Sequence, residues 1–157
     1  MKKVTAYIPR KEDLWYRKHL LSDEKTMAYN HSYGGTINFH EDRWQSWYNK
    51  WINTYDHFYA YLVNEYNEFI GEISYHLDNN KYICSIIIEY KYRNNGYGKL
   101  GLDLLCEIAK SNNINCLYDC LANDNPAINL FLNNGFEIEY ITSQNTIVKK
   151  TLIHFDV

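Results

Sequence analysis

The central segment of the chain, residues 83–109, limits the possible folds more than any other stretch of the sequence. Its first part, residues 83–89, is rich in isoleucine, which favours a buried strand. Glycines then follow at positions 96, 98 and 101, and apolar residues recur at helical spacing from Leu100 to Ala109. The segment therefore predicts a strand, a glycine-rich loop and a helix in direct succession, and the fold must combine a sheet with helices.

The rest of the chain supplies further strands and helices around this unit. Residue patterns predict strands at 3–8, 57–63, 69–77, 82–89, 114–121, 136–141 and 146–153, and helices near 14–21, 41–52, 100–109 and 126–134. Asn125, Pro126 and Gly135 mark the two ends of the last helix. We expect one domain, residues 1–157, of the mixed α/β class with α+β character. Its central sheet has about seven mostly antiparallel strands, and its element order is β-α-α-β-β-β-α-β-α-β-β.

Charge and hydropathy exclude two classes of partner. The formal net charge is −3 at pH 7, and the basic residues form no run longer than a pair such as Lys149-Lys150. This argues against a groove that neutralises nucleic-acid phosphates. The longest apolar stretches are far shorter than a membrane span, and no charged-then-apolar leader opens the chain. We expect a cytoplasmic protein without nucleic-acid or membrane partners.

The four cysteines, Cys84, Cys106, Cys116 and Cys120, form no C-x-x-C pair and show no zinc-type spacing with histidine. Buried free thiols in a reducing compartment are the expected state, and no metal site is predicted.

The glycine-rich loop carries the strongest chemical signal. Glycines between a strand and a helix let the backbone approach an anion, and the helix N-terminus adds partial positive charge. Arg93 begins this loop and adds a fixed charge with several donors. A tight turn beside a solvated arginine is the simpler alternative, but the strand before and the helix after the loop favour phosphate binding.

A dinucleotide fingerprint is a rival interpretation of the same loop. Gly96, Gly98 and Gly101 satisfy G-x-G-x-x-G, and Asp119 lies near the end of the following strand, where an acid that binds ribose is expected. That fingerprint normally opens a domain of several βαβ units, whereas here antiparallel-looking strands precede the loop and few residues follow it. We rank this interpretation below another ligand that carries a pyrophosphate.

Two motifs in a fixed order point to a known family. Residues 93–98, Arg-Asn-Asn-Gly-Tyr-Gly, resemble the Arg/Gln-x-x-Gly-x-Gly/Ala motif of the GNAT superfamily of acetyl-CoA-dependent N-acyltransferases. About thirty residues later, residues 124–131 with Gly135-Phe136 resemble its second motif. The resemblance implies a GNAT-like domain in which two parallel strands splay apart at the cofactor site.

The resemblance also implies where acetyl-CoA binds. The backbone amides of Asn94, Asn95, Gly96, Tyr97, Gly98 and Lys99, with Arg93 beside them, would hold the pyrophosphate. The strand edge at Ile86, Ile87 and Ile88 would bind the pantetheine amides, as an added strand does. Asn125 and Phe131 would line the thiol end. The family reaction is direct attack by an amine on the thioester in a ternary complex, so Cys84 is expected to be a buried thiol and not a nucleophile.

Two departures leave the acid–base groups open. Phe131 stands where many relatives have a tyrosine acid, and Tyr82 and Cys84 stand where some have glutamate or histidine. Tyr82 is a candidate proton relay, with packing as its alternative role. Glu72 is a second candidate because it is anionic at pH 7 and suits a cationic amine, provided that the strand register points it toward the acceptor.

Acceptor residues are expected from two regions. Tyr29, His31 and Tyr33 lie between the first two helices, and Tyr75 lies on the strand before Tyr82. The predicted function is acetyl-CoA-dependent acetylation of a primary amine of a small molecule or peptide. A non-catalytic acyl-CoA-binding module and an NAD(P)-binding oxidoreductase are the alternatives. The identity of the amine and formation of a homodimer stay open at this stage.

Overall fold

The computed structural model describes residues 1–31 and 34–153, and within them seven strands form one sheet. The strands are β1 (Val4–Tyr7), β2 (His57–Asn64), β3 (Phe69–Asp78), β4 (Lys81–Ile88), β5 (Cys116–Ala122), β6 (Glu137–Ile141) and β7 (Asn145–Thr151). The helices are α1 (Trp15–Ser22), α2 (Trp44–Trp51), α3 (Tyr97–Ser111) and α4 (Ala127–Asn133). This order confirms the predicted sequence of elements and the mixed α/β class.

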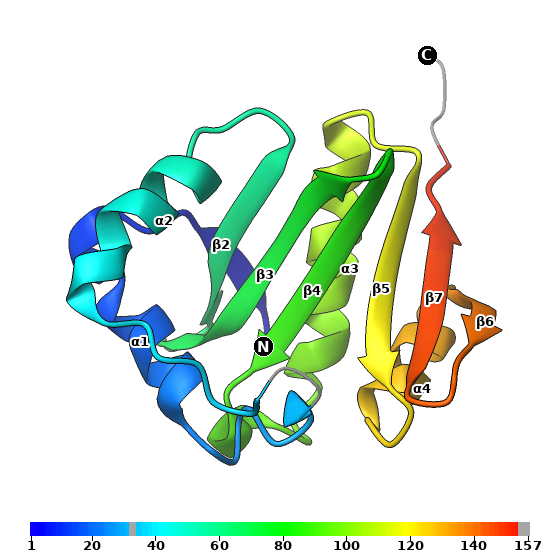
Figure 1. Cartoon of the computed structure of the whole chain (residues 1–157), viewed down its shortest axis with the longest axis horizontal. Helices are drawn as coiled ribbons and strands as arrows, with labels where there is room; N and C mark the ends of the chain where they lie inside the picture. Colours follow the sequence, from blue (N-terminus) through cyan, green and yellow to red (C-terminus); the bar gives the residue numbers. More distant parts are fainter. Residues whose placement is uncertain (32–33, 154–157) are drawn as a thin grey trace.

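The sheet runs in the order β1-β2-β3-β4-β5-β7-β6 (Figure 1). Strands β1 to β4 are antiparallel to their neighbours, and so are β5, β7 and β6. Only β4 and β5 are parallel, because α3 crosses between them. The prediction of a mostly antiparallel sheet with one parallel pair is therefore confirmed.

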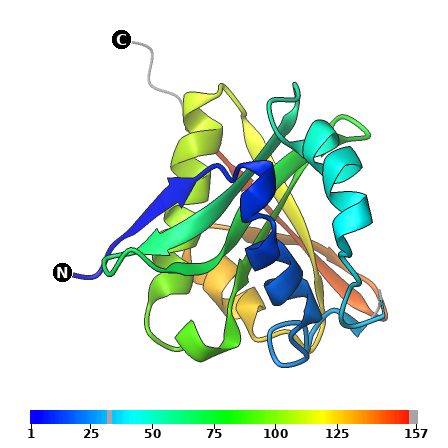
Figure 2. The same cartoon turned by 90° about the vertical axis from the view of Figure 1, so that its left-hand side faces the viewer.

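Helices cover both faces of the sheet (Figure 2). Helices α1 and α2 pack on one face over Tyr59 and Tyr61 of β2. Helices α3 and α4 pack on the other, where Leu102, Leu105 and Phe131 share the largest buried cluster with the strands. The alternation of side chains along each strand thus divides the molecule into two layers of core.

One glycine of the loop motif serves this packing. A Cβ atom at Gly101 would lie 2.8 Å from Leu62 Cδ1 and 2.9 Å from Ile86 Cδ1. Because real Cβ atoms do not approach other atoms so closely, glycine lets α3 lie directly on β2 and β4. Gly101 therefore serves the packing of the helix on the sheet. Gly96 precedes α3, and Gly98 lies in its first turn.

Candidate active site

The candidate site begins where β4 and β5 separate. The two strands pair only at Tyr82–Leu117 and Ile83–Tyr118. Past Ile83, β4 keeps its pairing with β3 as far as Ile88 but has no β5 partner in the described chain. The two ribbons diverge toward the end at which α3 begins (Figure 1). The edge of β4 that faces this gap is therefore free to bind an extended ligand, as predicted for residues 86–88.

The loop after β4 ends in a helix start without a cap. Asn94 and Gly96 have left-handed φ values of 63° and 84°, and Gly96 provides no side-chain cap for α3. The six successive N–H groups of residues 94–99 donate to no acceptor in the described part of the chain. Left-handed residues that alternate with right-handed ones turn successive N–H groups toward one concavity. With the dipole of α3 they make a site for an anion such as a pyrophosphate.

Gly98 lies where α3 meets α4. A Cβ atom at this position would stand 3.0 Å from Leu130 Cδ2, so a side chain here displaces the α4 residue or turns toward the loop amides. Glycine at this position therefore lets α3 and α4 pack closely.

Arg93 connects the loop to other parts of the chain. Its guanidinium donates to three backbone carbonyl oxygens, those of Ile88 at 2.9 Å, Thr26 at 2.7 Å and Lys25 at 3.4 Å. Three of its five N–H groups are thus occupied, and partial burial lowers its pKa. Arg93 ties the end of β4 to the segment after α1. Its predicted contact with a pyrophosphate stays a prediction.

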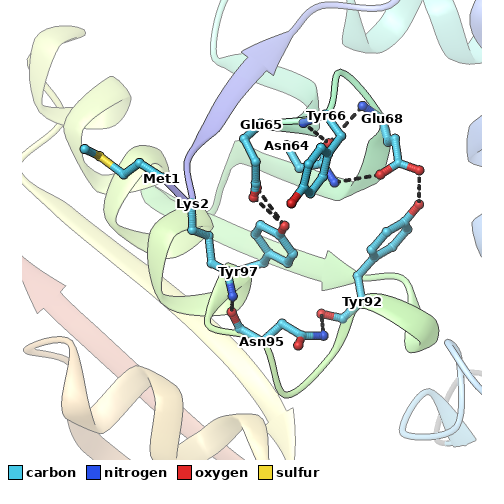
Figure 3. A pocket seen from close by; sticks show the side chains of 9 residues that line it. All are labelled: Met1, Lys2, Asn64, Glu65, Tyr66, Glu68, Tyr92, Asn95 and Tyr97. Carbon is cyan, nitrogen blue, oxygen red and sulfur yellow. Dashed lines mark hydrogen bonds between the residues drawn. The ribbon is translucent and has the colours of Figure 1, made fainter.

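Two tyrosines hold the loop against the β2–β3 turn (Figure 3). The Tyr97 hydroxyl donates to Glu65 at 2.6 Å, and the Tyr92 hydroxyl donates to Glu68 at 3.3 Å. These four residues and Lys2 line a pocket of about 350 Å³. The two hydrogen bonds hold the loop and the start of α3 against the β2–β3 turn.

The second motif forms the start of α4. The helix begins at Ala127, one residue later than predicted, and Asn125 Oδ1 accepts a hydrogen bond from the Ala127 N–H at 2.9 Å. Phe131 is fully buried and packs edge-on against Phe136 at 4.9 Å between ring centroids. Asn125 thus acts as a cap, and the Phe131 ring belongs to the core. Their predicted contact with the thiol end of the cofactor stays a prediction.

Glu72 forms a buried ion pair with Arg17. Its carboxylate accepts from Arg17 Nη1 at 2.9 Å and from the Tyr59 hydroxyl, and its side chain is only 7% exposed. The Arg17 guanidinium also lies 4.5 Å from the centre of the Trp47 ring. Desolvation and the nearby carboxylate raise the pKa of Tyr59, so its hydroxyl stays a donor. The predicted contact of Glu72 with a cationic amine would require this buried ion pair to open.

Tyr75 and Tyr82 lie at the far end of the sheet from the loop. Tyr75 is buried on the α3 face, and Asn112, at the C-terminal end of α3, donates to its hydroxyl at 2.7 Å. Tyr82 donates to Asp56 at 2.7 Å, which raises its pKa to about 12. Six residues, or roughly 20 Å of strand, separate Tyr82 from Ile88. Tyr82 pairs with Leu117, next to the point where β4 and β5 separate. The predicted roles of Tyr82 as a proton relay and of Tyr75 in the acceptor pocket stay predictions.

The segment between α1 and α2 bridges the two diverging strand ends. Thr26 accepts from Arg93 and, through its hydroxyl, from the Tyr90 N–H at 3.0 Å. Farther along, His31 Nε2 lies 3.1 Å from Asp124 Oδ1 in the loop after β5. Tyr29, which lies between these two contacts, is partly exposed. Residues 26–31 thus contact both the end of β4 and the loop after β5. The acceptor role of Tyr29 and His31 stays a prediction, and Tyr33 lies outside the described residues.

All four cysteines are free thiols, as predicted, but they are not all buried. Cys84 and Cys106 are buried, Cys116 is half-buried and Cys120 is exposed on β5. Burial raises the pKa of Cys84, which disfavours the reactive thiolate. This supports the expectation that Cys84 is no nucleophile. Among the described residues no cluster of three or more His, Cys, Asp or Glu side chains could hold a metal ion.

Asp119 is the residue that the sequence did not place in an acetyl-transfer site. It is the first residue of β5 past the last pair with β4, and it is half-buried. Burial raises its pKa to about 8. A single acid between Leu117 and Leu121 of a buried strand was visible in the sequence, but only the fold shows that it lies at the opening of the gap.

Comparison with known proteins agrees with this geometry. A sequence model of the acetyltransferase (GNAT) family matches residues 18–136. The chain belongs to the GNAT acetyltransferase family. Membership confirms the predicted reaction class, transfer of an acetyl group from acetyl-CoA to an amine, and removes the dinucleotide interpretation of the loop. A search of curated protein sequences finds no significant match.

Solved GNAT structures share the whole fold. Spermidine N-acetyltransferase from Vibrio cholerae, in complex with CoA and spermine, has a TM-score of 0.82 over 96% of each chain at 18% identity. The acetyltransferase (GNAT family) from Bacillus anthracis has a TM-score of 0.78 over 95% of each chain at 15% identity. In the described part of this GNAT chain, no helix is both long and apolar enough to cross a bilayer.

Proposed function

We propose that this GNAT chain transfers the acetyl group of acetyl-CoA directly to a primary amine of a small molecule, within a ternary complex. The observation that carries the proposal is that the loop amides of residues 94–99 lie next to the free backbone edge of β4. Six N–H groups without acceptors at the start of α3 adjoin a β4 edge that no strand covers. A ligand with an anionic pyrophosphate and an extended arm of amides fits both surfaces at once.

The loop and β4 would bind different parts of acetyl-CoA. The amides of residues 94–99 would hold the pyrophosphate, and the backbone of residues 86–88 would hydrogen-bond the pantetheine arm. Acetyl-CoA supplies an activated thioester when it is bound. The chain then has to position the amine, exclude water and supply a proton to the departing sulfur.

The acceptor would enter from the α1–α2 side. The connection that carries Tyr29 and His31 bridges the ends of β4 and β5 and so borders the gap opposite α3 and α4. Small-molecule amines are favoured because a relative with the same fold is named for spermidine and was solved with spermine. Polyamines are therefore the first acceptors to test.

The test is release of free coenzyme A thiol from acetyl-CoA in the presence of spermidine, spermine, single amino acids, an aminoglycoside and short peptides. We expect amine-dependent release with at least one small amine and formation of the N-acetyl product by mass spectrometry. Coenzyme A binding by calorimetry without release on any amine would overturn the proposed function in favour of an acyl-CoA-binding module.

That binding module is the second candidate function. Phe131, which cannot donate a proton, is the observation that favours it. The two candidates differ in one measurement, turnover, because both require the same loop.

A further inference from the structure

The side chain of Asp119 points to the face of the sheet that α3 and α4 cover. Val148 of β7 lies directly opposite Asp119 in the β5–β7 register, and directly opposite residues point to the same face. Val148, Leu117 and Leu121 all belong to the core cluster beneath α3 and α4. Asp119 is therefore the acidic member of this otherwise apolar row, and it lies at the level where β4 and β5 separate.

Asp119 has no basic partner among the described residues. Its Oδ1 accepts one hydrogen bond, from the Cys120 N–H at 2.7 Å, and no ion pair involves it. The ionisable groups around it are thiols, Cys84 on β4 and Cys120 on β5, with Cys106 of α3 beyond Cys84. Helix α4 carries no ionisable side chain.

A lysine of β7 on this face of the sheet makes a hydrogen bond to another group. Lys150, on β7, donates to the Asn134 carbonyl at 2.8 Å. Burial raises the pKa of the Asp119 carboxyl because a single backbone hydrogen bond, from Cys120, is weaker compensation for the charged form than the lost water. Asp119 is thus an acid with a raised pKa at the level where β4 and β5 separate.

The chain also lacks a hydroxyl at Phe131, so a proton donor for the sulfur is missing from α4. We propose that Asp119 is the general acid of acetyl transfer in this chain, an assignment that rests on the proposed function. As the amine nitrogen bonds to the carbonyl carbon, the C–S bond breaks and sulfur leaves with the electron pair. The proton of the Asp119 carboxyl moves to that sulfur. The resulting carboxylate regains a proton from the acetylated nitrogen, directly or through water, and the enzyme returns to its starting state.

Asp119→Asn is the decisive variant because it keeps the shape and the Oδ1 acceptor but has no acidic proton. The matched control is Glu107→Gln, which removes an exposed carboxylate from α3. We expect Asp119→Asn to lower kcat by about 100-fold or more, with coenzyme A affinity unchanged by calorimetry. We expect Glu107→Gln to leave both quantities unchanged.

The pH profile identifies the acid. For wild-type protein, kcat/KM for acetyl-CoA should fall as the pH rises above about 8, and this descending limb should be absent in Asp119→Asn. A readout independent of turnover is ¹³C NMR of aspartate carboxyl carbons in the ligand-free protein. One signal, missing in Asp119→Asn, should titrate with a midpoint far above the usual aspartate range.

Three results would overturn the assignment. An active wild-type enzyme whose kcat and pH profile are unchanged in Asp119→Asn would remove Asp119 from the reaction while leaving the proposed function intact. A carboxyl signal that titrates near pH 4 would do the same. A wild-type protein that binds coenzyme A but acetylates no amine would overturn the proposed function, and the acid role with it.

Discussion

Arg93 donates from Nη2 to the backbone carbonyl oxygen of Thr26 over 2.7 Å, and this contact joins two segments between which α2, β2, β3 and β4 lie in the sequence. One segment is the loop that presents the phosphate-binding amides. The other is the connection that borders the acceptor side of the gap. A single side chain therefore links the geometry of the cosubstrate site to that of the acceptor site.

Arg93→Ala should lower both stability and coenzyme A affinity. The variant loses three hydrogen bonds from a charged, half-buried group, and one such bond contributes about 1.5–3 kcal/mol. We expect the free energy of unfolding in urea to fall by about 2 kcal/mol and calorimetric affinity to fall as the loop loosens. Arg93→Lys is the control for charge, since an ammonium cannot reproduce the planar fork. If Arg93→Lys kept full coenzyme A affinity while Arg93→Ala lost it, the site would need the charge and not the loop geometry.

Gly98 and Gly101 should respond differently although they belong to one motif. Gly98→Val crowds Leu130 and the loop amides, so coenzyme A affinity should fall at least tenfold, about 1.4 kcal/mol. Gly101→Ala forces Leu62 and Ile86 aside, and overpacking of this kind costs about 1–3 kcal/mol, against which helix propensity returns about 1 kcal/mol. Calorimetry and urea unfolding of both variants separate the two effects. If the two variants lost coenzyme A affinity equally and were equally stable, Gly98 and Gly101 would not have separate roles in binding and in helix–sheet packing.

The sequence was sufficient for the loop because its signal is local. Residues 93–98 follow a strand and lead into a helix, and the three glycines lie within six residues of one another, so the loop could be recognised from spacing alone. The partners of Arg93 do not follow in this way, because Thr26 comes from a segment 67 residues earlier. Arginine was correctly assigned to the loop, but the direction of its side chain depends on tertiary packing.

Glu72 shows the same limit for a strand. Its face depends on register, and β3 pairs with β2 through a shift between Leu62 and Val63 that no local pattern reveals. Its partner Arg17 comes from α1, 55 residues away. The sequence shows that Glu72 is an acid within a strand, but it does not show that Arg17 pairs with it.

Glu72→Gln tests whether this ion pair is structural. The variant leaves the Arg17 charge buried without its carboxylate, and breaking a buried pair in this way costs about 3–5 kcal/mol. We expect a large loss in the free energy of unfolding, and partial recovery when Arg17→Met is added. A stable Glu72→Gln variant whose only defect is a raised KM for the amine would instead return Glu72 to the acceptor site.

Stability should depend on pH through Asp119, and the sign can be stated in advance. The pKa of this carboxyl is raised by burial to about 8 in the folded chain, against about 3.9 in an unfolded one. Between these values the folded state holds a proton that the unfolded state has released, so stability falls as the pH rises, by at most about 1.4 kcal/mol per pH unit. Above the folded pKa both states are ionised and the loss is complete.

Asp119→Asn isolates this contribution because its amide does not titrate and every other ionisable group is shared. The free energy of unfolding of the variant minus that of wild type, from urea titrations at several pH values between 5 and 9, should increase steadily up to about pH 8 and then level off. The variant gains stability relative to wild type as the pH rises, because ionisation of the buried Asp119 carboxyl, which lacks a basic partner, destabilises the folded wild-type protein. A difference that stays constant from pH 5 to 9 would mean that Asp119 titrates alike in the folded and unfolded states, and that the crevice between β4 and β5 is wet enough to solvate its charge.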